Sequence, residues 1–352
     1  MGNGQKLISE KKPTPELCYA FTENGVELPV LDITNPLFIS SIDETALDAL
    51  GKESMKQAKS LAENPLLRFF AKRSLTLGKF LPKENNATYV SGMSTLMMKL
   101  GPGLVGGGVK RFMDRKVAEG FVAMTVRMRL RDICRIQAEA LIPKLRNSQG
   151  KNLCFINIGG GSASDSINSL ILLQEKEPAL LKERKIEINV LDLDTFGPSF
   201  AGRSIESLRE LGGRFHGLDV SFRFIQYDWK DTAKLADLLS ERKDWIQVCE
   251  SEGGLFEYGT DEEITHNLTS LFNNTSDDAI IAGDIVLDME KVNPAFPAML
   301  KGSSNMIRFI GIEGLKKILE RTSWKIDGIV EKNPTYIFFT LKKIKTMEFA
   351  SY

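Results

Sequence analysis

The sequence predicts an α/β protein with a doubly wound, mostly parallel seven-stranded sheet, a C-terminal antiparallel hairpin and a helical N-terminal segment. From Leu153 onward, short apolar runs alternate with amphipathic segments, which is typical of a parallel sheet with helices on both faces. The last two apolar runs are joined by residues 332–334, too few for a crossover helix, so they form a hairpin. Residues 1–120 lack this alternation and contain seven prolines, which favours short helices joined by turns. We expect a helical cover over residues 1–120 and a ligand-binding domain over residues 121–352.

Local patterns place the individual elements. Tyr89–Val109 is first apolar and Met-containing and then glycine-rich, which favours either a core helix before a surface loop or a hinged lid over an apolar ligand. Apolar residues recur at steps of three and four over Phe121–Leu141, which predicts a helix that Pro143 limits. Beyond it we expect strands at 153–158, 186–192, 220–227, 245–251, 279–287, 325–331 and 335–343, and helices at 163–176, 200–211, 231–241, 260–273 and 312–321.

Composition argues against several classes of protein. The 352 residues contain 46 Lys and Arg and 46 Asp and Glu, so no net charge attracts nucleic acid or an anionic membrane, and we expect neither as a partner. With two His and four scattered Cys, we expect no metal site and reduced, buried thiols. The N-terminus lacks the apolar core of a signal peptide, and no apolar run approaches the roughly 18 residues that span a bilayer. These features predict a cytoplasmic protein of undefined oligomeric state.

The segment Phe155–Asp165 is the most informative motif. A buried-strand pattern ends in Gly159, Gly160 and Gly161 and continues into a helix, so the backbone can approach a ligand closely. The spacing suits both a dinucleotide site of an oxidoreductase and an S-adenosylmethionine site. The sequence therefore predicts a nucleotide-type ligand at the carboxyl ends of the strands.

The second strand ends in acid, as Asp192-Leu193-Asp194. A carboxylate there can accept hydrogen bonds from both hydroxyls of a ribose, and Asp192 is the better placed of the two candidates, with Asp194 as the alternate. Either carboxylate could instead be solvated or cap a helix.

The order of elements resembles the class I S-adenosylmethionine-dependent methyltransferases, because the sheet is expected to end in an antiparallel hairpin. Two segments are further similar to the leucine carboxyl methyltransferase and polyketide O-methyltransferase group. Ser251-Glu252-Gly253 with Leu255 and Tyr258 fits its Glu-Gly-x-Leu-x-Tyr signature, and Arg127–Asp132 fits its Arg-x-Arg-x-x-Asp segment. The resemblance covers residues 121–345.

The resemblance implies roles for further residues around S-adenosylmethionine. An acid at the end of the third strand, Asp228, would accept a hydrogen bond from the adenine amino group, and Trp229 would cover the ring or serve only in packing. Arg129 or Arg127 would bind the methionine carboxylate, unless both belong to a solvated basic face. Glu250, on the fourth strand, is a further candidate for donor binding.

The implied activity is methyl transfer, most simply to a hydroxyl or carboxylate oxygen of a small, partly apolar molecule. Tyr258 and Glu252 are the candidates for a catalytic base, although each can be structural, whereas His266 lies in a polar helix. A protein or peptide carboxyl methyltransferase is an alternative. So is a non-catalytic donor-binding protein, because Asn157 and Ala163 stand where the group has other residues.

Overall fold

The computed structural model describes residues 17–76, 89–105, 111–300 and 306–344. Within them, seven strands form the main sheet in the order β5-β4-β3-β6-β7-β9-β8. The strands are β3 (Leu153–Ile158), β4 (Lys185–Asp192), β5 (Asp219–Gln226), β6 (Ile246–Ser251), β7 (Ile280–Val286), β8 (Trp324–Val330) and β9 (Tyr336–Lys343). The pairs from β5 to β7 are parallel, whereas β9 is antiparallel to both β7 and β8. The predicted fold class, including the terminal hairpin, is confirmed.

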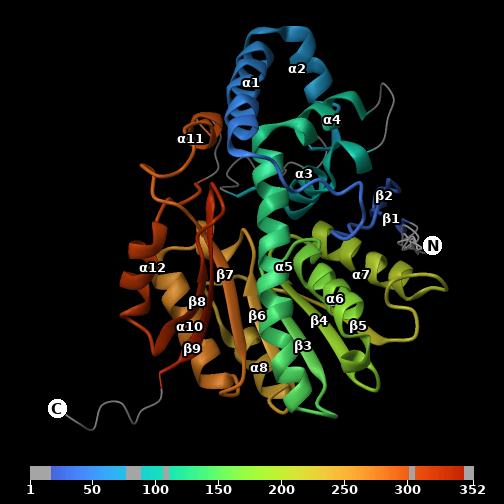
Figure 1. Ribbon diagram of the computed structural model, residues 1–352, viewed down its shortest axis with the longest axis vertical. Coiled ribbons are helices and arrows are strands. Elements are labelled where there is room, and N and C mark those ends of the chain that lie inside the picture. Colours follow the sequence, from blue (N-terminus) through green and yellow to red (C-terminus); the bar gives the residue numbers. More distant parts are fainter. Residues whose placement is uncertain (1–16, 77–88, 106–110, 301–305, 345–352) are drawn as a thin grey trace, which may run out of the picture.

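Helices cover both faces of this sheet (Figure 1). The helices of this part are α5 (Phe121–Asn147), α6 (Ser164–Lys176), η3 (Pro178–Leu181), α7 (Phe196–Arg209), α8 (Ala233–Glu241), α9 (Leu255–Tyr258), α10 (Asp261–Asn274), α11 (Ala295–Leu300) and α12 (Gly311–Leu319). Alternate side chains of β3 point to opposite faces: Leu153 and Phe155 pack with α5, α6 and α7, while Cys154 and Ile156 pack with α8, α10 and α12. Each face of the sheet therefore has its own hydrophobic core.

Most predicted element boundaries lie within two residues of the observed ones. Helix α7 begins at Phe196 and not at residue 200, and the short helices α9 and α11 were not predicted. Helix α5 continues past Pro143 to Asn147, contrary to the expected limit. Pro143 is exposed, so its missing N–H leaves a carbonyl on the solvent side, while Leu141 and Leu145 continue the buried stripe.

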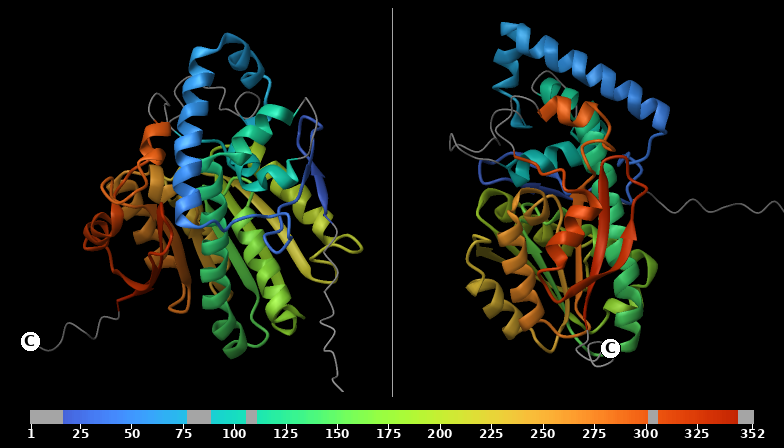
Figure 2. Two further views of the ribbon diagram at one scale, coloured as in Figure 1. Left: turned by 45° about the horizontal axis from the view of Figure 1, so that its top comes forward. Right: turned by 90° about the vertical axis from the view of Figure 1, so that its left-hand side faces the viewer.

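The N-terminal residues form a cap above the carboxyl ends of the parallel strands (Figures 1 and 2). The cap consists of the hairpin β1 (Tyr19–Phe21) and β2 (Glu27–Pro29) and of the helices α1 (Glu44–Glu63), α2 (Pro65–Ala71), α3 (Gly92–Leu104) and α4 (Phe112–Glu119). The predicted short helices are present as α2 and α4, but α1 has 20 residues and the hairpin was not expected. Residues 106–109 of the predicted glycine-rich loop lie outside the described residues.

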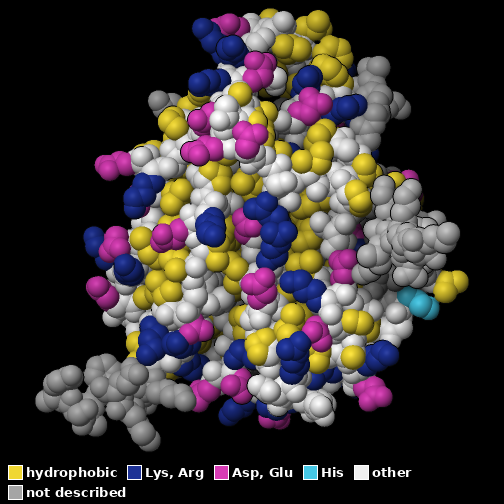
Figure 3. All heavy atoms as spheres, in the orientation of Figure 1, with side chains coloured by type: hydrophobic (Ala, Val, Ile, Leu, Met, Phe, Trp, Pro, Cys, Tyr) yellow, Lys and Arg dark blue, Asp and Glu magenta, His cyan; other side chains and the backbone are white. Residues whose placement is uncertain are grey.

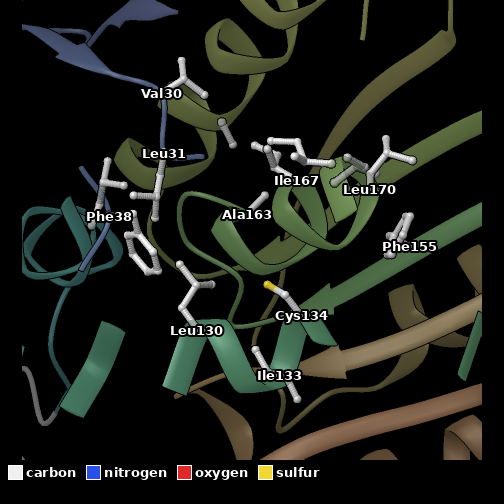
Figure 4. Close-up of a cluster of buried hydrophobic side chains, with 14 of the residues drawn as sticks. Val30, Leu31, Phe38, Leu130, Ile133, Cys134, Phe155, Ala163, Ile167 and Leu170 are labelled. Atoms are coloured by element: carbon white, nitrogen blue, oxygen red, sulfur yellow. The ribbon is translucent and has the colours of Figure 1, made fainter. Parts of the chain in front are cut away.

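The cap shares a core with the sheet domain. Val30, Leu31 and Phe38 of the cap pack beside Leu130 and Ile133 of α5 in one hydrophobic cluster (Figure 4). The first turn of α5 lies in the cap and its last turns lie beside β3 (Figure 1). The boundary proposed at residue 120 thus coincides with the start of a helix, but buried contacts cross it.

On the face shown in Figure 3, acidic and basic side chains are interspersed, in agreement with the zero formal net charge. In the described part of the chain, no helix combines the length and apolarity needed to cross a membrane.

Candidate functional site

The loop after β3 has a conformation that lets its backbone come close to neighbouring groups. Gly159 and Gly161 have φ of 70° and 48°, and Ala163 adopts the left-handed conformation before α6. A Cβ on Gly159 would lie 3.3 Å from Gly254 Cα, and one on Gly160 would lie 2.4 Å from the side chain of Asn157. Side chains are therefore excluded at these positions, and the loop presents backbone to the carboxyl edge of the sheet.

Asn157 supports the loop from below. Its Nδ2 donates to Asp165 Oδ1 at 2.6 Å and to Ser166 Oγ at 3.1 Å, so the side chain joins β3 to the first turn of α6. Burial, with the nearby charge of Glu252, raises the pKa of Asp165 to about 6. The neutral amide of Asn157 thus donates to a buried carboxyl group, where a second carboxylate would place two like charges together.

Asp192 ends β4 beside the glycine loop. Its Oδ2 accepts a hydrogen bond from the Gly161 backbone N–H at 2.8 Å, and its Oδ1 accepts one from Asp194 N–H at 2.9 Å. Burial raises the pKa of Asp192 to about 6, although these backbone hydrogen bonds favour the ionised form. Asp194 also borders the pocket, and its Oδ1 accepts a hydrogen bond from Phe196 N–H at the start of α7.

The end of β5 contributes aromatic side chains. Tyr227 and Trp229 line the pocket, and the Tyr227 hydroxyl donates to Asn267 Oδ1 at 2.6 Å, which fixes the ring. Asp228 lies between them but is exposed and is not among the residues that line the pocket; its Oδ1 accepts a hydrogen bond from Lys230 N–H. At this strand end the structure thus places the two aromatic side chains, and not the Asp228 carboxylate, in the lining of the pocket.

A buried ion-pair chain lies at the end of β6. The Glu252 carboxylate forms ion pairs with Lys99 Nζ of α3 and with Arg129 Nε of α5, each at 2.5 Å. Arg129 Nη1 forms a second ion pair with Glu257, at 2.6 Å. Burial alone would raise the pKa of Glu252, but Arg129 and Lys99 hold it below its usual range. Asp284 also lies buried beside this chain, where burial raises the pKa of its carboxyl group. Two cations and two carboxylates thus alternate in this chain, and Lys99 and Glu252 are the members that line the pocket.

Arg127 and Glu250 lie outside the pocket lining. The Arg127 guanidinium donates to the carbonyls of Ile39, Met98 and Ala118, which ties α5 to the cap. Glu250 is fully buried within the sheet, where it accepts hydrogen bonds from Gln137 and Ser166. These contacts give both residues a structural role, whereas the sequence analysis considered them as candidates for binding the donor.

Tyr258 lines the pocket close to the start of α3, where it forms a hydrogen bond with the Val90 backbone. Burial, with the adjacent charge of Glu257, raises the pKa of the Tyr258 hydroxyl above its ordinary value. Both histidines, His216 and His266, are exposed and do not border the pocket.

These groups surround one pocket at the carboxyl edge of the sheet. Its lining consists of Tyr89, Val90, Gly92, Thr95 and Lys99 from the cap, Gly159–Ser162 after β3, Leu191–Asp194 at β4, Tyr227 and Trp229 after β5, and Glu252–Gly254 with Tyr258 after β6. The sequence predicted the glycines, Asp192, Asp194, Trp229, Glu252 and Tyr258 as site residues. It indicated Tyr89–Val109 as a possible lid but named no site residue on α3. One signal was present for Lys99, since it is the only charged residue in the apolar helix Gly92–Leu104.

The pocket spans the point where the chain, after running outward through β3, β4 and β5, returns to the other side of β3 as β6. Beyond β7 the sheet closes with β9 inserted antiparallel between β7 and β8. The chain has the fold of the class I methyltransferases. No family model matches the sequence, and no curated protein matches it.

Solved structures with a similar fold include a possible exported protein from Bordetella parapertussis, with 13% identity over 87% of this chain and 100% of that chain and a TM-score of 0.48. The mitomycin 7-O-methyltransferase MmcR matches with 14% identity over 66% of this chain and 57% of that chain, at a TM-score of 0.40. A methyltransferase from Clostridium acetobutylicum, described as S-adenosylmethionine-dependent, matches with 12% identity over 59% of this chain and 91% of that chain, at a TM-score of 0.39. The match to MmcR thus spans less than two thirds of that protein.

Glycine contacts hold the cap against the pocket loop, which leads to a testable prediction. A Cβ on Gly92 would lie 2.6 Å from Gly161 Cα, a backbone atom that cannot rotate away. We expect Gly92→Ala to destabilise the protein by about 1–3 kcal/mol, as overpacking typically does, and to weaken ligand binding in the pocket. Urea unfolding measures the first effect and calorimetric titration the second.

Gly103→Ala, on the same helix, serves as the control, because the nearest atom to its added Cβ is Leu37 O at 3.2 Å, a longer distance than the 2.6 Å at Gly92. Equal stabilities of the two variants would show that the contact between α3 and the loop is not tight.

Proposed function

We propose that this chain transfers the methyl group of S-adenosylmethionine to an oxygen of a small, partly apolar molecule. The observation that carries the proposal is the pocket itself, in which a side-chain-free glycine loop, the carboxylate of Asp192 and the aromatic wall of Tyr227 and Trp229 meet at the switch point of a class I methyltransferase sheet. When bound, the donor supplies a methyl group already activated on a sulfonium.

The residues present suit such a donor. The glycine loop would lie along its ribose and methionyl part, Asp192 would accept hydrogen bonds from the ribose hydroxyls, and Trp229 would cover the adenine. Lys99 is the cation that lines the pocket, and Glu252 is its hydrogen-bond partner among the described contacts, so an ammonium with three donors can also meet a carboxylate. Arg129, the cation expected there from the sequence, already serves Glu252 and Glu257.

The protonation of the pocket favours a carboxylate as methyl acceptor. Among the described lining residues, Glu252 is held by two cations and Tyr258 has a raised pKa, so neither is a base near neutral pH. Asp192, with a pKa of about 6, could accept a proton, but this proposal assigns its carboxylate to the ribose hydroxyls. A hydroxyl acceptor needs a group that removes its proton, whereas a carboxylate arrives deprotonated. The task of the protein is then to orient the acceptor oxygen in line with the methyl group and to exclude water, which the cap above the pocket can do.

A protein or peptide carboxylate is chemically possible by the same reasoning. We favour a small acceptor because α3 lies against the glycine loop and narrows the pocket on the cap side. A cytoplasmic location is part of the proposal, since all four cysteines are free and three of them are buried.

Calorimetric titration with S-adenosylmethionine, and separately with a reduced nicotinamide cofactor, tests the donor site. We expect only the methyl donor to bind. Incubation with the donor carrying a deuterated methyl group and a panel of carboxylates and phenols, followed by mass spectrometry, then identifies the acceptor. Donor binding without transfer to any acceptor would favour a non-catalytic donor-binding protein, and nicotinamide binding alone would contradict the proposal.

Tyr258→Phe tests the assignment of a base-free reaction. If the acceptor is a carboxylate, the hydroxyl is not needed for proton transfer, and kcat should fall by less than about tenfold, below the 10²–10⁴-fold that general bases contribute. The pH profile of kcat separates the two cases further, because a tyrosine base with a raised pKa would add a limb on which kcat rises with pH, and the variant lacks that limb. A larger loss together with loss of that limb would make Tyr258 the base.

A further inference from the structure

A second cavity, of about 390 Å³, lies between the cap helices, the first turn of α5 and α11, and is called the cap cavity below. Helices α1, α4 and α5 contribute most of its walls, with Leu67 of α2, Met98 of α3 and Met299 of α11 completing them. No residue lines both this cavity and the donor pocket, although α3 borders the two: Thr95 and Lys99 face the pocket, and Met98 faces the cavity. The volume lies within the range of small-molecule sites, roughly 300–1,000 Å³.

The walls of this cap cavity are apolar, with one charge. Ten of its fifteen lining residues have apolar side chains, and three of these are methionines, which adapt to ligands of irregular shape. The charged residue among them is Lys116, and no carboxylate lines the cavity. Lys116 Nζ and Arg115 Nε share a single carboxylate partner, Glu119, so Lys116 is not neutralised by a partner of its own. Charge complementarity therefore selects an apolar ligand with an anionic end.

The surface beside the cap cavity is also apolar. Phe112, which lines the cavity, is half exposed, and Leu66, Phe69 and Phe70 of α2 are exposed next to the lining residue Leu67. Close-packed protein interiors leave few voids, so a cavity of this size with an apolar approach is a feature that ligands with long hydrocarbon parts can use.

We propose that the cap cavity binds an aliphatic carboxylate, with the hydrocarbon chain between α1, α4 and α5 and the carboxylate at Lys116. This site is separate from the donor pocket, so the proposal does not depend on the methyltransferase activity. A ligand in the cap cavity would contact Met98 of α3 and so restrict the motion of the helix that also borders the donor pocket.

The test is displacement of the fluorescent fatty acid cis-parinaric acid from the full-length protein by sodium decanoate and by 1-decanol. Ala58→Trp fills the cavity from α1, where residue 58 is exposed and so tolerates a larger side chain. Lys59→Trp is its matched control, because Lys59 is the next residue on α1 and does not line the cavity. Lys116→Gln removes the charge, and Arg115→Gln is the control for it.

We expect decanoate to displace the probe from the wild type and from Lys59→Trp, and Ala58→Trp to bind at least about tenfold more weakly. Lys116→Gln should weaken the binding of decanoate by about threefold, the size expected for a partly exposed ion pair, and should not change the binding of decanol. Arg115→Gln should change the binding of neither compound. Saturation with S-adenosylhomocysteine should not displace the probe. Absence of binding, unchanged binding by Ala58→Trp, or displacement by S-adenosylhomocysteine would overturn the site. Equal effects of Lys116→Gln on decanoate and decanol would overturn the assignment of the carboxylate.

Discussion

Asp192→Ala should weaken binding of S-adenosylmethionine by roughly 100-fold, which is the loss expected when two hydrogen bonds to a charged group disappear. Asp192 lines the pocket beside the glycine loop, and its carboxylate is already fixed by Gly161 N–H and Asp194 N–H. The ligand therefore meets an oriented acceptor and does not have to order it. Isothermal titration calorimetry measures the change.

Asp194→Ala is the matched control, because Asp194 borders the same pocket but faces the start of α7 through its contact with Phe196 N–H. If Asp194→Ala loses affinity and Asp192→Ala does not, the ribose contact belongs to the alternate carboxylate.

The raised pKa of Asp192 gives opposite pH dependences for binding and for stability. With a pKa of about 6 in the folded protein, Asp192 is ionised at pH 7 and protonated at pH 5, so donor affinity should fall as the pH drops through 6. The folded pKa lies above the unfolded one, so this group contributes stability that is complete below pH 4 and lost as the pH rises through 6. Asp192→Asn should reduce that loss by roughly 1–3 kcal/mol, measured by urea unfolding at pH 4.5 and pH 7. Asp165, with a similar pKa, adds a loss of the same sign that the variant retains.

The sheet domain could be predicted from the sequence because its signals are local. Parallel strands buried on both faces, such as Leu153–Ile158, are continuous apolar runs, and each is followed by an amphipathic helix. The short connection at Asn333 and Pro334 leaves an antiparallel hairpin as the one possible pairing of the last two strands. Once the strands are known, the glycine loop and Asp192 can be placed in one site, because the carboxyl ends of neighbouring parallel strands lie at the same edge of the sheet.

The cap and the ion-pair chain could not be predicted, because they depend on contacts between distant residues. Lys99 and Glu252 are separated by 153 positions, and nothing in the local pattern of an apolar helix pairs them. Arg127 and Arg129 match the same sequence segment, yet two positions on a helix turn by about 200°, so only one of them can face the strand ends. In the structure Arg129 reaches Glu252, while Arg127 binds carbonyls of the cap.

Arg129→Met should be among the most destabilising substitutions, at about 3–5 kcal/mol, because it leaves the buried Glu257 without its cation and Glu252 with Lys99 alone. Arg129 is 4% exposed, lies over the Tyr336 ring, and bridges Glu252 and Glu257. Methionine fills a similar volume, so the loss reports mainly charge. Urea unfolding measures it, with Lys316→Met as the control, which removes the exposed Lys316–Glu313 pair and should cost at most about 1 kcal/mol.

A second substitution shows where the cost of Arg129→Met arises. Glu257→Gln in the same chain removes a carboxylate whose cation is gone, so the double variant should be more stable than Arg129→Met alone. Donor titration of the folded single variant then separates two roles for Arg129. If the arginine is structural and Lys99 meets the methionine carboxylate, Kd stays within about threefold of the wild type, because folded molecules retain the lysine. A loss of 100-fold or more, roughly the effect of removing a charged hydrogen-bond partner, would place Arg129 on the donor, as the resemblance implies.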